Sequence, residues 1–179
     1  GEAGVGYVME EGYDLPPLMF TRDEIVALVA GARLIRAFGG ADMARGAEEA
    51  LVKIGAVLPE AERLRAGRVP IHAIGPRMTD DLRAMIDRIE VATEASRRLA
   101  LDYSDQNGVA TRRVIRPLGL WFWGAVWTVV GWCELRDDFR MFRLDRIDAM
   151  QEGAPFKPER GRQLQDFYRQ MEAQHPGRE

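Results

Sequence analysis

Residues 111–147 read TRRVIRPLGLWFWGAVWTVVGWCELRDDFRMFRLDRI, and the fold class follows from this stretch. Short apolar runs rich in β-branched and aromatic residues alternate here with turn residues, which is the pattern of consecutive strands. Gly124 and the triplet Arg136-Asp137-Asp138 supply two of the turns. We therefore expect four strands in this stretch, at residues 111–117, 118–123, 125–133 and 139–147.

A hairpin signal precedes these strands. From Arg98 the period is two, because Leu99, Leu101 and Tyr103 alternate with Ala100 and Asp102, and Asn107-Gly108 follows. Asn-Gly between two alternating runs is the strongest short hairpin signal, because both residues tolerate positive φ. Five short antiparallel strands then favour a small barrel that closes its own edges.

Helical patterns flank the strands. Thr21-Arg22-Asp23-Glu24 is a capping box, and Gly39-Gly40 ends the helix that it opens. Thr79 caps another helix, which directly precedes the first strand. Small apolar faces on the early helices indicate a linker or dimerisation bundle rather than a catalytic core. The remaining helices are expected at residues 42–57, from Pro59 to Gly67, and at 164–171, with a short apolar piece at 69–76.

Composition excludes several classes of protein. The 179 residues are 46% apolar and 30% charged, with a formal net charge of -3, which suits a globular chain with a real core. Cys133 is the only cysteine, so a disulfide framework and a multi-cysteine zinc site are ruled out. Neither His72 nor His175 stands near a nucleophile or a second histidine, so we expect no enzyme, no metal and no cofactor.

No membrane or export signal is evident. The longest uncharged stretch, residues 117–133, has 17 residues and is interrupted by glycines. A membrane-spanning helix needs about 20 apolar residues, so buried strands explain this stretch better. The first ten residues, GEAGVGYVME, lack the basic and apolar regions of a signal peptide. We expect a cytoplasmic protein.

Arginine dominates the cations. The chain has 23 Arg and two Lys, and arginine suits bidentate recognition of phosphate and carboxylate. A GC-rich genome also explains a general excess of arginine. The arginines of the last strand have two readings: they pair with Asp137, Asp138 and Asp145 on a solvated sheet face, or they bind a ligand. Nearby tryptophans likewise serve as core or as stacking platforms for bases.

Four pieces of the strand region carry a family resemblance. They are RVIRPL (113–118), WFWG (121–124), VWTVVGWCELR (126–136) and FRMFRLDRI (139–147). Together they closely resemble the WYL domain of YafY-like bacterial transcriptional regulators, which carry a DeoR-type helix-turn-helix. GVGY (4–7) and GYDLPPLMF (12–20) resemble the end of the DNA-binding wing and the linker in the same family. The triplet that names the family is Trp127-Thr128-Val129 here, so threonine replaces the tyrosine.

The resemblance implies a fold and a function. The fold is α+β: a helical linker bundle, a preceding helix and an Sm-like, SH3-type five-stranded antiparallel β-barrel. The function is effector sensing for an upstream winged helix-turn-helix that binds duplex DNA and lies before residue 1. The implied domains are a wing remnant (1–20), a helical linker and dimerisation region (21–75), the effector-sensing barrel (76–155) and a C-terminal helix and tail (156–179).

We expect the effector to be an anion, either a nucleotide or a single-stranded nucleic acid. The residues predicted to bind it are Arg113, Arg140, Arg143, Arg146, Trp127, Thr128 and Tyr103. We also expect a homodimer, because the apolar faces of the early helices exceed what three short helices bury alone; these faces contain Ile25, Leu28, Val29, Leu51 and Ile54. The alternative is a purely structural dimerisation or protein-interaction domain without a ligand.

Overall fold

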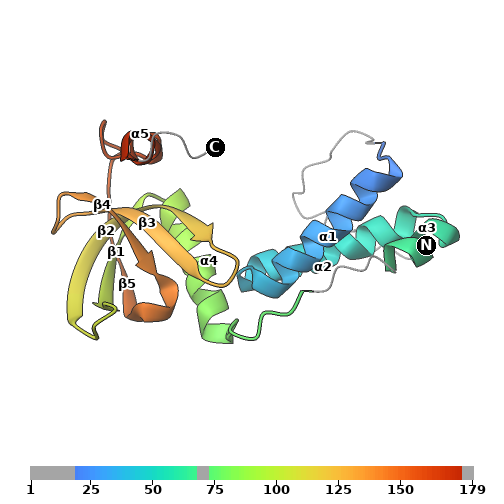
Figure 1. Cartoon of the computed structure of the whole chain (residues 1–179), viewed down its shortest axis with the longest axis horizontal. Coiled ribbons are helices and arrows are strands. Elements are labelled where there is room, and N and C mark those ends of the chain that lie inside the picture. The colour runs from blue at the N-terminus through green and yellow to red at the C-terminus, as the bar shows by residue number, and fades with distance from the viewer. Residues whose placement is uncertain (1–18, 68–72, 175–179) are drawn as a thin grey trace, which may run out of the picture.

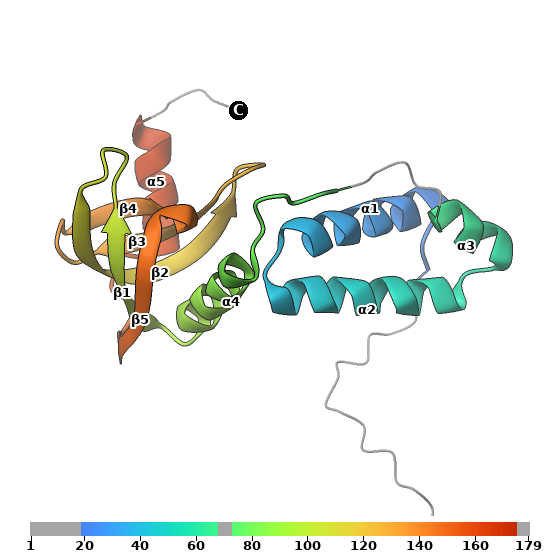
Figure 2. The ribbon, with the colours of Figure 1, turned by 90° about the horizontal axis from the view of Figure 1, so that it is seen from below.

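The computed structural model of the protein describes residues 19–67 and 73–174. An elongated helical part lies beside a sheet domain (Figures 1 and 2). The sheet domain includes a fourth helix, which stands between the sheet and the helical part. The elements in chain order are α1 (Arg22–Phe38), α2 (Ala41–Val57), α3 (Glu60–Gly67), α4 (Asp80–Glu94), β1 (Arg97–Ser104), β2 (Ala110–Phe122), β3 (Trp127–Cys133), β4 (Asp138–Arg143), the 3-10 turn η1 (Leu144–Arg146), β5 (Ile147–Pro155) and α5 (Leu164–Gln174).

The helix boundaries follow the local signals of the sequence. Thr21 accepts a hydrogen bond from the Glu24 amide, and the Glu24 carboxylate accepts from the Thr21 amide, which completes the predicted capping box. The α1 helix ends at Gly39, as expected. Thr79 likewise accepts from the amide of Leu82 at the start of α4. Predictions at residues 1–18 and 69–72, including the wing remnant and His72, lie outside the described residues, as does His175.

The sheet is antiparallel with the strand order β4-β3-β2-β1-β5. This confirms the predicted α+β class with five antiparallel strands. The prediction that the strands close into a barrel is wrong. Among the described strands no hydrogen-bonded ladder joins the edge strands β4 and β5, so the sheet is open. The two edge strands are instead connected in sequence through η1.

Two predicted strands are one. The predicted break at Pro117 is absent, and β2 runs through it with a register shift between Pro117 and Gly119. Proline is tolerated at this point because the ladder between β1 and β2 ends at Ile115, so Pro117 lies beyond the residues that pair with β1.

The predicted last strand, residues 139–147, breaks into β4, η1 and the start of β5. Phe142, Leu144 and Ile147 all belong to the main core. A continuous strand would place residues 144 and 147 on opposite faces, because side chains alternate with period two. The 3-10 turn removes this conflict, and β5 then continues to Pro155, where the sequence analysis expected no strand beyond residue 147.

The main core lies between α4 and the concave face of the sheet. Ile86 and Ile89 of α4 pack there with Leu99, Leu101 and Ile115, and all five are fully buried. The opposite face of the sheet has a second core, in which Phe167 of α5 packs with residues of β3 and β4, namely Val130, Trp132 and Phe139. The sheet domain is therefore packed on both faces.

The α1–α2 turn is held by side chains of the sheet domain. Arg83 of α4 donates to the carbonyls of Gly39 (2.6 Å) and Ala37 (2.9 Å) at the end of α1. One turn further along α4, the carboxylate of Asp87 accepts from the amide of Ala41 (2.9 Å) at the start of α2. A Cβ on Gly40 would lie 2.0 Å from Asp87 Oδ1, so this close approach requires glycine. We call this set of contacts the joint.

Candidate anion-binding site

A polar pocket of about 230 Å³ opens where the concave face of the sheet runs past the end of the core. On β1 and β2 the pairs Leu101–Arg113 and Tyr103–Thr111 follow the buried pair Leu99–Ile115. Strand alternation keeps these residues on one face, so the same face changes from apolar to polar toward the hairpin. The pocket lining comprises Tyr103, Asp105, Thr111, Arg113, Cys133, Arg136, Arg140, Met141 and Phe142.

Arg113 is the central feature of the pocket. Its Nε donates to the hydroxyl of Thr111 at 3.2 Å. Its Nη1 is buried and has no hydrogen-bond partner within the part of the chain that the structure describes. A buried donor without a partner costs free energy, more so when it carries charge. An anion in the pocket would remove this cost.

The other charged groups of the pocket differ in how far they are already paired. Arg140 donates to the Asp138 carboxylate and, at 2.7 Å, to the carbonyl of Phe139. Burial raises the pKa of Asp138, but hydrogen bonds from Arg140, Gln170 and the Phe139 amide hold this pKa below its ordinary value. The Asp105 carboxylate accepts from the amides of the hairpin turn, those of Asn107 (2.8 Å) and Val109 (3.0 Å). The pocket is thus lined by three arginines, Arg113, Arg136 and Arg140, and by one carboxylate, Asp105, which already accepts from backbone amides.

The shape of the pocket limits what enters it. Tyr103 stands edge-on to Phe142, with ring centroids 5.1 Å apart, and buried Cys133 belongs to the lining. Pockets for drug-sized ligands measure about 300–1,000 Å³. This smaller pocket suits one compact anionic group, such as a phosphate or a sugar phosphate, rather than a length of polymer.

The structure brings together three of the seven predicted ligand residues, Tyr103, Arg113 and Arg140. It adds Thr111 and Arg136, which the sequence analysis missed. Thr111 was accessible to sequence reasoning, because a hairpin centred on residues 105–109 places it opposite Tyr103. Arg136 lies in the turn between β3 and β4. Side chains in turns follow no regular alternation, so the sequence could not predict where this side chain points.

The other four predicted residues do not line this pocket. Arg143 makes a two-pronged ion pair with Asp145, at 3.0 and 2.7 Å. The hydroxyl of buried Thr128 accepts from the indole of Trp123 at 3.0 Å. Arg146 ends η1, and the pKa of Asp145 is lowered first by the hydrogen bonds from Arg143 and further by the charges of Arg143 and Arg146. The role of these residues in ligand binding stays a prediction.

Trp127 adds a further contact to the joint between the helical part and the sheet domain. Its indole Nε1 donates to the carbonyl of Phe38 at 2.7 Å, at the last residue of α1. Its ring lies 5.1 Å from that of Phe122, which in turn lies 5.0 Å from that of Phe38. The indole at the start of β3 therefore binds the helical part to the sheet, at the end of β3 away from Cys133 and the pocket.

A known family matches the sheet domain. The model of the family described as WYL domain matches residues 84–152. The resemblance to a WYL domain is confirmed for this segment, and the YafY-like, DeoR-type assignment stays a prediction. We call residues 84–152 the WYL segment; it spans most of α4, η1 and β1 to β4, and most of β5.

The chain is also similar to solved structures. The chain resembles proteasome accessory factor B/C (PafBC) of Arthrobacter aurescens at 22% sequence identity and a TM-score of 0.43. The similarity covers 82% of this chain and 22% of that protein.

Neither a metal cluster nor a membrane span is found in the described part of the chain. Within residues 19–67 and 73–174, no group of three or more His, Cys, Asp and Glu side chains is placed to hold a metal ion. No helix in the same ranges is long and apolar enough to cross a membrane.

Proposed function

We propose that this chain is the effector-sensing and dimerisation region of a bacterial transcriptional regulator. In this proposal an anionic effector, a nucleotide or a single-stranded nucleic acid, binds the pocket of the WYL segment and controls DNA binding by an upstream winged helix-turn-helix. The observation that carries the proposal is the buried, unpartnered Nη1 of Arg113, in a pocket that Tyr103 and Arg140 also line. The WYL match supports the regulatory role.

The size of the pocket sharpens the expected mode of binding. A phosphate seated beside Arg113 accepts from Nη1, and Arg136 and Arg140 supply further positive charge. A charge-assisted hydrogen bond contributes about 1.5–3 kcal/mol. If the effector is a single strand, one phosphate enters the pocket and its neighbours remain outside.

The test is a binding titration of the whole chain with inorganic phosphate, mononucleotides and short single-stranded oligonucleotides. The variant Arg113→Met keeps most of the aliphatic packing and removes the guanidinium. We expect it to weaken binding by roughly 10- to 100-fold, at about 1.4 kcal/mol for each factor of ten. Arg140→Ala should weaken binding in the same direction, and by less, because Arg140 already pairs with Asp138.

Arg112→Met is the matched control. Arg112 neighbours Arg113 on β2, points to the other face and lies 3.9 Å from Asp102 in a largely exposed pair. Both variants change the net charge by the same amount, so general electrostatic attraction falls equally. Equal affinity of the Arg112 and Arg113 variants for every probe would contradict the proposal.

The alternative, a structural domain without a ligand, is favoured by the ion pairs Arg140–Asp138 and Arg143–Asp145. It predicts that no probe binds, and that Arg113→Met changes only stability. Removing the buried, unpartnered Nη1 of Arg113 should raise the melting temperature under either proposal. Melting temperature and affinity measured on the same variants therefore separate the two.

A further inference from the structure

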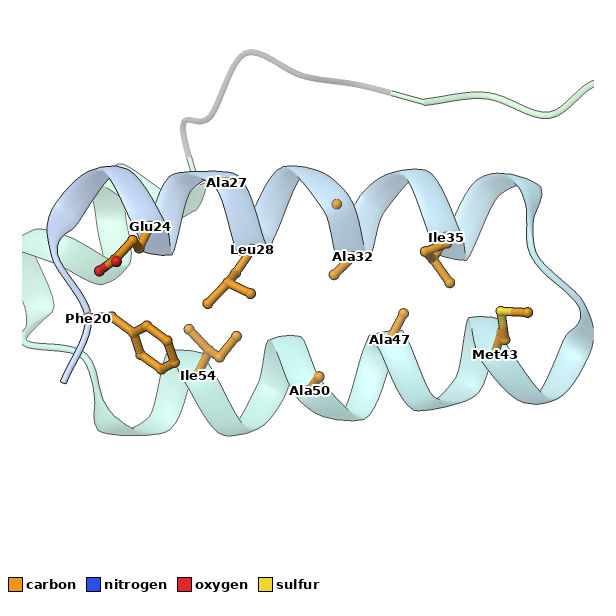
Figure 3. Close-up of a pocket in the computed structure, with 11 residues that line it drawn as sticks. Phe20, Glu24, Ala27, Leu28, Ala32, Ile35, Met43, Ala47, Ala50 and Ile54 are labelled. Atoms are coloured by element: carbon orange, nitrogen blue, oxygen red, sulfur yellow. The ribbon is translucent and has the colours of Figure 1, made fainter. Parts of the chain in front are cut away.

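The α1–α2 pair has two unlike faces. One face contains Arg33 and Arg36 of α1, and α3 lies at its edge with Arg63. The other face is an apolar groove of about 640 Å³ that runs along both helices (Figure 3). Its lining is Phe20, Glu24, Ala27, Leu28, Gly31, Ala32, Ile35, Met43, Ala47, Ala50 and Ile54.

The groove offers almost no charge to a partner. Among the described residues that line it, Glu24 alone is charged. The Glu24 carboxylate already accepts from the amide (2.6 Å) and the hydroxyl (2.9 Å) of Thr21, so it caps α1. A nucleic acid or a charged peptide would find nothing to pair with here. The occupant must offer an uncharged, apolar surface.

The groove has bulky ends and a middle stretch, here called the waist, that is lined by small residues. Phe20, Leu28 and Ile54 cluster toward one end, and Ile35 and Met43 stand at the other (Figure 3). Between them the lining is alanine and glycine. Along α2 the lining residues are spaced by four, three and four positions, from Met43 to Ile54, which is the spacing of a seam between packed helices. Small residues at such a seam allow another helix to approach closely.

The remaining core of the helical part does not cover this face. Ile25, Val29, Ala30 and Leu51 pack together on the inner side of the pair. Phe20, Leu28 and Ile35 remain 49%, 41% and 40% exposed. Part of the apolar face that the sequence assigned to a dimer is thus used within one chain, and the groove is what remains.

We infer that the groove is the contact surface for a second copy of this chain, which lays its own groove across the first to form a four-helix bundle. Two αα-hairpins packed about a twofold axis bury such seams against each other. The shape of the groove is self-complementary, because the bulky ends of one copy can flank the waist of small residues in the other. This deepens the homodimer of the proposed function by assigning its surface.

The face is large enough for this role. Each helix of 17 residues is about 25 Å long at about 1.5 Å per residue. Two helices side by side, each about 10 Å across, present a face on the order of 500 Å² in projection. A specific interface buries at least about 1,000 Å² in total, or about 500 Å² on each partner, so the face meets this lower bound.

The experiment is sedimentation of the whole chain and of charge variants at the waist. Ala50→Arg and Gly31→Arg place a guanidinium on exposed positions of the groove, and a Cβ on Gly31 meets no atom within 4 Å. We expect a dimer for the parent chain at micromolar concentration. Each variant should raise the dimer dissociation constant by at least about 100-fold, because the charge would be buried without a partner.

Val52→Arg and Leu34→Arg are the controls. Both side chains are exposed, at 65% and 46%, and neither lines the groove. They should leave the dimer intact, and circular dichroism should show the same helix content in all four variants. Two independent positions, one on each helix, keep the test valid if one variant misfolds.

Three results would overturn the inference: a monomeric parent chain, a dimer that survives both waist variants, or a groove that binds an apolar small molecule or a foreign peptide in place of a second copy. The phosphate and nucleotide titrations of the pocket are independent of these results. A dimer that survives with intact ligand binding would reject the groove and leave the proposed function standing.

Discussion

The sheet domain and the helical part differ in how they are stabilised. In the sheet domain, core residues from α4 and all five strands are buried to 8% exposure or less, and several are fully buried. In the helical part, α1 buries only Val29 and Ala30, and α2 buries no residue at all. The sheet domain therefore has its own core. The helical part depends on contacts from outside itself, at the joint and, as we propose, at a second copy.

This difference suggests a division of roles. A rigid, densely packed domain can hold the side chains of a small pocket in fixed positions. A helical pair with little core of its own is held in place by a few hydrogen bonds, and its position can respond to small changes at the joint. Arg83, Asp87 and Trp127 are the side chains that make those bonds.

The largest expected effect tests the contrast in packing. Leu101→Ala removes a fully buried side chain from the main core and should lower the free energy of unfolding by about 2–5 kcal/mol. Leu34→Ala, on the exposed side of α1, should change it by no more than about 0.5 kcal/mol. Chemical denaturation of both variants gives the two values. Similar losses in the two variants would mean that the helical part is as tightly packed as the sheet.

A smaller effect is expected at the joint. Asp87→Ala removes the carboxylate that caps α2 in place of the missing N-cap side chain, and should cost about 0.5–2 kcal/mol. Hydrogen exchange should accelerate at the amides of Ala41 and Asp42, with little change in the strands. Glu94→Ala, near the end of the same helix, is the control and should leave those amides protected. Uniform exchange across the chain in the Asp87 variant would show that the joint holds the whole fold rather than the helical part.

The smallest effect concerns acid stability of the sheet domain. Burial raises the pKa of Glu134, but hydrogen bonds from Arg98 and Arg116 outweigh it and hold this pKa below its ordinary value. A carboxyl whose pKa is lowered by folding stabilises the fold above its ordinary pKa, and this contribution is lost as the pH falls through the lowered value. The pair is partly exposed, so Glu134→Gln should cost below about 1 kcal/mol at neutral pH.

Thermal unfolding followed from pH 7 downward measures this contribution. The difference between the parent chain and the Glu134→Gln variant should shrink as the pH falls below about 4.5, the ordinary value for a glutamate. A constant difference across the whole range would mean that the variant acts through packing rather than through the ion pairs with Arg98 and Arg116.

Much of the secondary structure was determined by the sequence alone, because its signals are local. The capping threonines Thr21 and Thr79, the stop at Gly39 and the hairpin near Gly108 act through neighbours four or fewer residues away. Alternation along β1 and β2 likewise fixes the face on which Tyr103 and Arg113 lie. The family resemblance rested on residues of the same strands.

Only the tertiary structure decided how these elements meet. Asp87 accepts from an amide of α2 that lies 46 residues earlier, and Trp127 donates to a carbonyl of α1 that lies 89 residues earlier. No local pattern encodes such pairs, because they depend on the packing of α4 between two layers. The 3-10 turn η1, which separates β4 from β5, is likewise a tertiary effect, because both Leu144 and Ile147 are buried in the main core. The unpartnered Nη1 of Arg113 also depends on packing, because burial on the concave face separates this atom from water.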